Sequence, residues 1–220
     1  MKESCRIGLL GGTFDPIHNG HLAVARAVKE ALALDQVLLI PASKPPHKLH
    51  SPITSFDTRA AMIRAALAGE PSLALSLVEQ DTNGPSFSID TLERLAASLD
   101  SRQFYFIIGA DAFADIHSWK RFRDIPRLTS LVVVNRHGAD CHWQPQVSIK
   151  HYFPEFKLAR QGVWQAEGQG DILLFAMPLV DISSTKVRDL VRGGGDISAL
   201  VPAGVAVAIE RHGLYEDGGR

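Results

Sequence analysis

The amino-acid sequence predicts an α/β protein with a doubly wound, mostly parallel sheet and helices on both faces. Short apolar runs have the length and the residue types of buried strands, and they cover residues 7–10, 37–40, 73–77, 104–108, 131–134 and 172–177. Stretches with helical spacing lie between several of them. Because alternating strands and helices are typical of parallel sheets with right-handed crossovers, we expect helices to cover both faces.

The first predicted helix follows the first strand, and one of its faces is apolar at Leu22, Ala25, Val28 and Leu32. The second has the same spacing at Ala60, Ile63, Ala66 and Leu67. Further helices are predicted over residues 89–99, 185–192 and 203–212.

Two segments lack a regular period. Residues 41–55 contain four prolines, so we expect a loop after the second strand. Residues 136–170 contain scattered aromatic residues, and their sequence predicts no particular element. We expect one domain over residues 1–220, with a small C-terminal helical part from about residue 183 to residue 220.

The composition is that of an ordinary soluble protein, with 45% hydrophobic and 21% charged residues. The formal net charge of −1 argues against general binding to nucleic acid or to a membrane surface. We expect no signal peptide, because the apolar run near the start is short and broken by glycines, and no segment has the ~20 apolar residues of a membrane helix. Cys5 and Cys141 lie far apart, which fits a reducing compartment. We therefore expect a cytoplasmic protein with a local anion site.

The first strand runs into the string GGTFDPIHNGH, residues 11–21. If residues 7–10 form the first strand and the first helix starts at Gly20, GGTFDPIHN is the loop between them, at the carboxyl edge of the sheet where doubly wound folds bind ligands. Gly11 and Gly12 allow backbone N–H groups to approach a ligand, and the start of the next helix favours an anion. His18 and His21 project to one side of this helix start, where they can donate hydrogen bonds to phosphate oxygens.

Other interpretations of this string explain less of it. A helical zinc pair usually has the pattern HExxH with a third ligand elsewhere, so no protein-bound metal is expected here. A glycine-rich turn with incidental histidines would explain a lone GGT or HxxH, but not the complete string. The string is also neither a Walker A motif nor a GxGxxG fingerprint.

The string GGTFDPIHNGH resembles the N-terminal signature of the HxGH nucleotidylyltransferase superfamily, in the form of the bacterial nicotinate-mononucleotide adenylyltransferase family. A second string, ISSTKVR at residues 182–188, is similar to the ISSTxxR element of that family. By residue type alone, Ser183, Ser184 and Thr185 suit a helix N-cap, and the guanidinium of Arg188 can bind phosphate oxygens. The resemblance implies a Rossmann-like nucleotidylyltransferase fold.

Further strings extend the resemblance over nearly the whole chain. KPPHK resembles a loop that closes over phosphates with Lys44 and Lys48, although solvated lysines remain an alternative. IIGAD and VVVNR resemble strand ends that face the nucleotides. Trp119 matches a tryptophan on which the family stacks the pyridine ring. In GPSFSIDTL, Phe87 and Ser88 stand where the family usually has tyrosine and threonine.

The resemblance implies three overlapping sets of site residues. The catalytic residues are His18 and His21. The residues that bind ATP are Gly11, Gly12, Thr13, Phe14, His18, His21, Gly109, Asp111, Arg136, Ile182, Ser183, Ser184, Thr185 and Arg188. The residues that bind the mononucleotide are Thr13, Lys44, Ser88, Asp111 and Trp119.

The activity that the resemblance implies joins ATP and nicotinate mononucleotide to give deamido-NAD and pyrophosphate, a step of NAD biosynthesis. The phosphate of the mononucleotide attacks the α-phosphorus in line, without a covalent enzyme intermediate. Mg²⁺, held mainly by the ATP phosphates, is the expected cofactor. Three alternatives stay open: phosphopantetheine adenylyltransferase, nicotinamide-mononucleotide adenylyltransferase and a non-catalytic nucleotide-binding regulator. Whether the chain forms a homo-oligomer is also left open.

Overall fold

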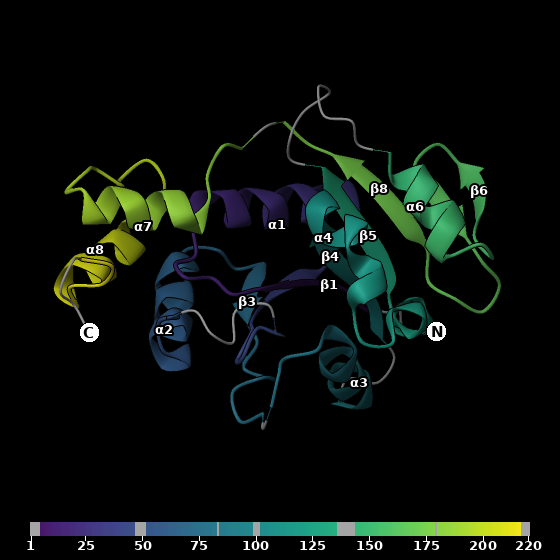
Figure 1. Cartoon of the computed structure of the whole chain (residues 1–220), viewed down its shortest axis with the longest axis horizontal. Coiled ribbons are helices and arrows are strands. Elements are labelled where there is room, and N and C mark those ends of the chain that lie inside the picture. The colour runs from purple at the N-terminus through teal and green to yellow at the C-terminus, as the bar shows by residue number, and fades with distance from the viewer. Residues whose placement is uncertain are drawn as a thin grey trace.

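The computed structural model describes residues 5–46, 52–82, 84–98, 102–135, 144–178 and 180–216. Within these residues, one sheet of eight strands crosses the molecule (Figure 1), in the order β3-β2-β1-β4-β5-β8-β7-β6. The strands are β1 (Cys5–Gly12), β2 (Gln36–Pro41), β3 (Leu73–Leu75), β4 (Arg102–Gly109), β5 (Ser130–Asn135), β6 (Lys157–Arg160), β7 (Val163–Gln165) and β8 (Ile172–Ala176).

The helices are α1 (Asn19–Ala31), α2 (Phe56–Ala66), α3 (Ser88–Ser98), α4 (Ala110–Ala114), α5 (Ile125–Leu128), α6 (Pro145–Tyr152), α7 (Ser184–Arg192) and α8 (Ala203–Arg211). Two short 3₁₀ turns, Ile116–Ser118 and Phe122–Asp124, lie between α4 and α5. None of the described helices is long and apolar enough to cross a membrane.

All six predicted strands are present, and they pair in parallel. The predicted doubly wound, mostly parallel sheet is therefore confirmed. The strand predicted over residues 73–77 ends earlier, at Leu75, because β3 pairs with β2 at three positions only. The antiparallel strands β6 and β7 extend the sheet beyond β8, and they come from the segment for which the sequence predicted no element.

The two faces of the sheet carry two separate cores, because successive side chains of a strand point to opposite sides. In β5, Val132 and Val134 belong to the core beneath α1, α2, α7 and α8. Leu131 and Val133 belong to the other core, which packs against α3, α4, α5 and α6. This double burial explains why the central strands are continuous apolar runs.

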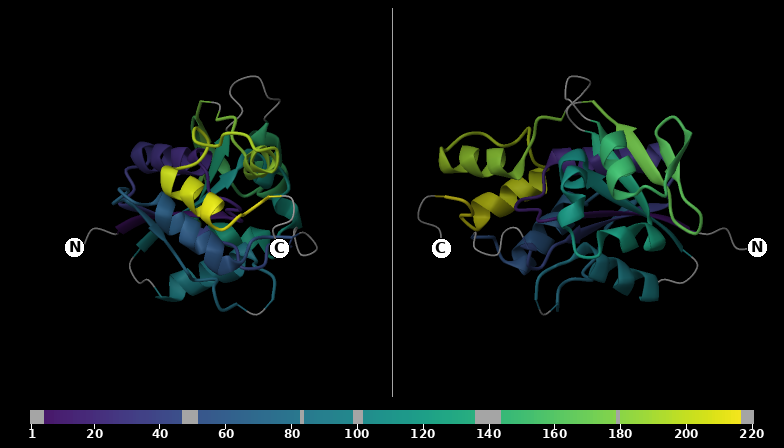
Figure 2. Two further views of the ribbon diagram at one scale, coloured as in Figure 1. Left: turned by 90° about the vertical axis from the view of Figure 1, so that its left-hand side faces the viewer. Right: turned by 45° about the vertical axis from the view of Figure 1, so that its right-hand side comes forward.

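The C-terminal helices fold back onto the beginning of the chain. Figures 1 and 2 show α8 beside α2, and Figure 1 shows α7 above α8, on the face that also carries α1. The approach of α8 to α2 is close, since a Cβ atom added to Gly204 would lie 3.2 Å from the Cβ of Ala65. At the start of α1, the backbone N–H of Asn19 donates to the carbonyl of Leu200 at 2.8 Å. Distant parts of the sequence therefore meet beside the first loop.

Candidate functional site

A cleft of about 720 Å³ lies at the carboxyl edge of the sheet, and this volume is within the ~300–1,000 Å³ typical of ligand sites. The ends of β1 and β4 line it with residues 10–12 and 106–109. These two strands are neighbours in the sheet, and the strand order reverses between them, since β2 and β3 lie on one side and β5 on the other. The cleft is thus at the topological switch point, where doubly wound folds bind ligands.

Many of the sequence-predicted site residues meet in this cleft: Gly11, Gly12, Thr13, His21, Ser88, Gly109, Asp111 and Trp119 line it. The other described candidates are not among its lining residues: Phe14, His18, Lys44, Ile182, Ser183, Ser184, Thr185 and Arg188. Arg136 and Lys48 lie outside the described residues.

His18 and His21 stack on each other at the start of α1, with ring centroids 3.7 Å apart and planes 27° apart. His18 is the N-cap residue and is only 2% exposed. Its backbone N–H donates to Nδ1 of His21 at 3.3 Å. Because Nδ1 of His21 is the acceptor, Nε2 carries the hydrogen in the neutral ring and is the donor nitrogen. His21 thus offers an N–H group at the cleft wall, and His18 supports its ring.

Phe14 supports the same ring from another side. It packs edge-on against His21 with centroids 4.9 Å apart, and it is 1% exposed with a left-handed backbone φ of 51°. A Cβ atom added to Gly12 would lie 3.1 Å from the Phe14 ring. The side chain of Phe14 is therefore a core group that holds the loop in place.

Gly20 gives the His18 ring its space. A Cβ atom at this position would lie 3.0 Å from Nδ1 and 3.1 Å from Cε1 of His18. Alanine normally favours a helix over glycine by roughly 1 kcal/mol. We expect Gly20→Ala to displace the His18 ring and the stacked His21 ring, and so to lower kcat about 10- to 100-fold without a loss of melting temperature. Steady-state kinetics and thermal denaturation of the variant test this prediction. A kcat of Gly20→Ala equal to that of the wild type would contradict it.

The string ISSTKVR contacts the first loop. Ser183 caps α7 by accepting the N–H of Lys186 at 3.1 Å. The hydroxyl of Ser184 donates to the carbonyl of Pro16 at 2.9 Å. Nη1 of Arg188 donates to the carbonyl of Asp15 at 2.7 Å. The two strings are thus joined by hydrogen bonds although they are far apart in sequence.

Nη2 of Arg188 donates to Oγ1 of Thr185 at 3.2 Å. Ile182, the first residue of this string, packs against the core beneath α1. The guanidinium is thus already oriented by two contacts, one to the first loop and one within α7.

Arg59 of α2 binds both loops that border the cleft, and it is 1% exposed. Its guanidinium donates to three backbone carbonyls: those of Thr54 at 2.9 Å, Thr13 at 2.6 Å and Ala42 at 2.9 Å. Burial lowers the pKa of Arg59, and the carboxylate of Asp15 opposes this shift. Since Thr13 and Ala42 line the cleft, Arg59 sets the relative position of two of its walls.

Asp15 is the buried carboxylate of the first loop, and it is 5% exposed. The hydroxyl of Tyr215 donates to it at 2.7 Å, and the backbone N–H of Thr54 donates at 3.3 Å. Burial, followed by the charge of Asp15, raises the pKa of Tyr215 well above its usual range. The C-terminal residues thereby anchor the loop that carries the histidines.

Glu79 joins the second loop to α3. Its carboxylate accepts the hydroxyl of Thr91 at 2.6 Å and the backbone N–H of Ser43 at 3.1 Å. Beside it, the backbone N–H of Lys44 donates to Oγ of Ser86 at 3.0 Å, and the N–H of Ser86 donates to the carbonyl of Lys44 at 2.9 Å. Lys44 is thus held near the rim, with an exposed side chain.

Comparison with known proteins identifies the family of the chain. Residues 9–190 match the Cytidylyltransferase-like family. A probable nicotinate-nucleotide adenylyltransferase of Geotalea daltonii is 40% identical over 216 residues, which are 97% of this chain and 99% of that protein. A protein of the same name from Syntrophotalea carbinolica is 39% identical over 211 residues, 96% of this chain and 97% of that protein. The chain belongs to the nicotinate-nucleotide adenylyltransferase family.

The fold of this adenylyltransferase chain is similar to that of a solved structure, whose name is similar to the names of these relatives. Plasmodium falciparum nicotinic acid mononucleotide adenylyltransferase, solved in a complex with NaAD, has a TM-score of 0.72 with 18% identity, and the match covers 96% of this chain and 97% of that one. The Rossmann-like nucleotidylyltransferase fold predicted from the sequence is therefore confirmed.

Sequence reasoning missed the residues that hold the walls of the adenylyltransferase cleft in place. Arg59 carries a usable signal, because it lies at a core-facing position of α2, three and four residues before the buried Met62 and Ile63. A charged residue on an apolar helix face normally has buried partners. Glu79 and Tyr215 carry no comparable signal, since neither lies in a periodic stretch.

Proposed function

We propose that this chain transfers the adenylyl group of ATP to nicotinate mononucleotide and releases deamido-NAD and pyrophosphate, as a step of NAD biosynthesis. The names of the relatives support the substrate pair. The observation that carries the proposal is the contact between the two strings: His21 lines the cleft at the start of α1, and Arg188 and Ser184 bind the loop that leads into α1.

The reaction needs positioning and charge stabilisation more than acid–base chemistry. An oxygen of the mononucleotide phosphate attacks the α-phosphorus of ATP, and the bond from that phosphorus to the bridging oxygen of pyrophosphate breaks. The attacking oxygen is already an anion, so it needs no general base. The N–H of His21 donates to a phosphate oxygen whose charge grows in the transition state. Gly11 and Gly12, at the end of β1, leave the backbone accessible to phosphates.

The described residues contain no group of three or more His, Cys, Asp or Glu side chains that could hold a metal ion. We infer that Mg²⁺ would be carried mainly by the ATP phosphates and water, with Asp111, which lines the cleft, as the residue that would contribute an oxygen ligand. When bound, such an ion would neutralise part of the negative charge of the phosphates. The protein's residues orient the two nucleotides around it.

Release of pyrophosphate tests the proposal. The protein is mixed with ATP and Mg²⁺, and with nicotinate mononucleotide, nicotinamide mononucleotide or phosphopantetheine in separate reactions. We expect the highest kcat/KM with nicotinate mononucleotide. Turnover with none of the three would exclude the adenylyltransferase activity, and a higher kcat/KM with either other acceptor would refute the substrate assignment.

A further inference from the structure

The end of the cleft formed by α3 and the segment after α4 combines aromatic rings with a positive charge. Phe87, Trp119 and Lys120 line it together. The ring of Trp119 meets Phe106 edge-on, with centroids 6.2 Å apart. This end differs from the glycine-rich end near β1, because it offers flat apolar surfaces and one cation. Such a combination suits a flat aromatic anion.

The positive charge of Lys120 distinguishes it from the other residues that line the cleft. Among the described residues that line the cleft, it is the sole lysine or arginine. The lining carboxylates belong to Glu79, Asp111 and Asp115. A ligand carboxylate in this cleft would meet mostly negative side chains, so its binding depends on the cation at the aromatic end.

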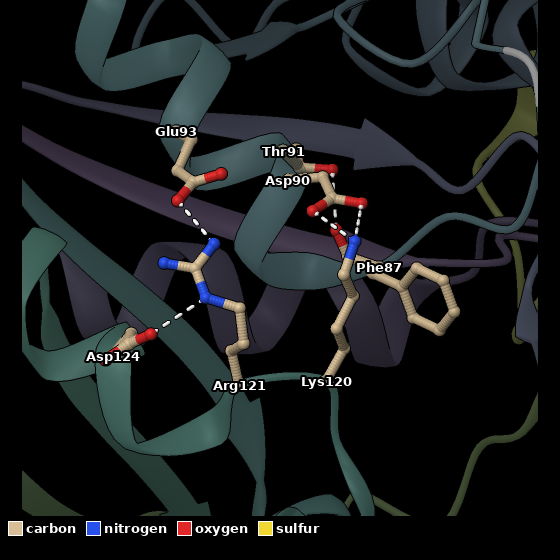
Figure 3. Close-up of polar contacts among 7 residues, drawn as sticks. All are labelled: Phe87, Asp90, Thr91, Glu93, Lys120, Arg121 and Asp124. Atoms are coloured by element: carbon tan, nitrogen blue, oxygen red, sulfur yellow. Dashed lines mark hydrogen bonds and ion pairs between the residues drawn. The ribbon is translucent and has the colours of Figure 1, made fainter.

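The ammonium group of Lys120 is held in position by two neighbours, as Figure 3 shows. It lies 5.0 Å from the centroid of the Phe87 ring. It donates to both carboxylate oxygens of Asp90, at 2.8 and 2.9 Å. Both side chains are partly exposed, at 43% and 28%, so this ion pair contributes little to stability. The ammonium carries three N–H groups, and it can be shared with a second carboxylate.

We propose that Lys120 binds the carboxylate of the nicotinate ring and thereby sets the preference for the acid over the amide mononucleotide. This inference rests on the proposed function and extends it to the choice of acceptor. Acid and amide have nearly the same shape and differ by one charge. Neutral donors, such as the hydroxyl of Ser88, can serve a carboxylate and an amide carbonyl alike. A cation discriminates between them, because its attraction requires the negative charge.

The experiment compares Lys120→Met with the wild type. We expect the ratio of kcat/KM for nicotinate mononucleotide to kcat/KM for nicotinamide mononucleotide to fall roughly tenfold, mainly through a higher KM for the acid. Lys120→Arg should keep most of the preference, because it keeps the charge. Calorimetric Kd values for both mononucleotides give the same ratio without turnover.

Arg121→Met is the matched control. Arg121 is the neighbouring cation, and it pairs with Glu93 and Asp124 at 2.8 Å each, in contacts that also link this segment to α3 (Figure 3). It does not line the cleft, so its loss should leave the ratio unchanged. An unchanged ratio in Lys120→Met, or an equal fall in Arg121→Met, would overturn the inference. A wild type without turnover would refute the proposed function instead, while the Kd ratio would still decide the role of Lys120.

Discussion

Replacing His21 with alanine is expected to lower kcat about 10²–10³-fold and to change the KM for ATP much less. The imidazole lines the cleft, and its Nδ1 is occupied by the backbone N–H of His18, so Nε2 is the donor. A donor that is already oriented in the free protein stabilises the charge that develops on a phosphate oxygen in the transition state. Its loss therefore affects the chemical step more than binding.

Steady-state kinetics with ATP varied at saturating mononucleotide separates the two effects. His212→Ala is the control, because His212 is an exposed residue at the end of α8. We expect wild-type kinetics from it. If His21→Ala kept a near-normal kcat, or raised KM and left kcat unchanged, the transition-state role of His21 would be wrong.

Replacing Arg59 with methionine is expected to lower the free energy of unfolding by about 3–5 kcal/mol. Methionine fills a similar volume, but it leaves the carbonyls of Thr13, Ala42 and Thr54 without their donor. It also removes the positive charge beside the buried carboxylate of Asp15. Urea denaturation measures the loss.

Arg64→Met is the matched control for this prediction, because Arg64 lies on the exposed side of the same helix. We expect a change within about 0.5 kcal/mol for it. Arg59→Lys keeps the charge but cannot reproduce the fork of donors, so its stability should lie between those of Arg59→Met and the wild type. Equal stability of Arg59→Met and Arg64→Met would contradict the role assigned to the Arg59 hydrogen bonds.

The central sheet could be predicted because its strands leave a strong pattern. Residues 131–134 are apolar without interruption, since Val132 and Val134 face one core while Leu131 and Val133 face the other. The segment between β1 and α1, here called the histidine loop because it leads to His18 and His21, could be located for a related reason. It follows the first such run, and doubly wound folds place that loop at the edge of the sheet where ligands bind.

Other features depend on contacts between distant residues and leave no local pattern. The hairpin of β6 and β7 has this character, since β6 is exposed along its length and is held through β7. The hydrogen-bond partners of Arg59 are another example. Helix spacing shows that Arg59 faces the core, but its three carbonyl partners belong to loops that approach it only in the folded chain. The role of Lys120 could not be predicted from its neighbours in sequence, because it depends on which other charged side chains line the cleft.

The hydrogen bonds of the histidine loop also bear on the synthesis of the chain. Ser184 donates to Pro16, and Arg188 and Tyr215 donate to Asp15; these three donors follow 168, 173 and 200 residues later. During translation the loop emerges well before these partners. A ribosome-bound chain that stops before α7 can form β1, α1 and their neighbours, yet its histidine loop lacks these anchors. The nascent chain therefore completes the loop only after α7 and Tyr215 have been synthesised.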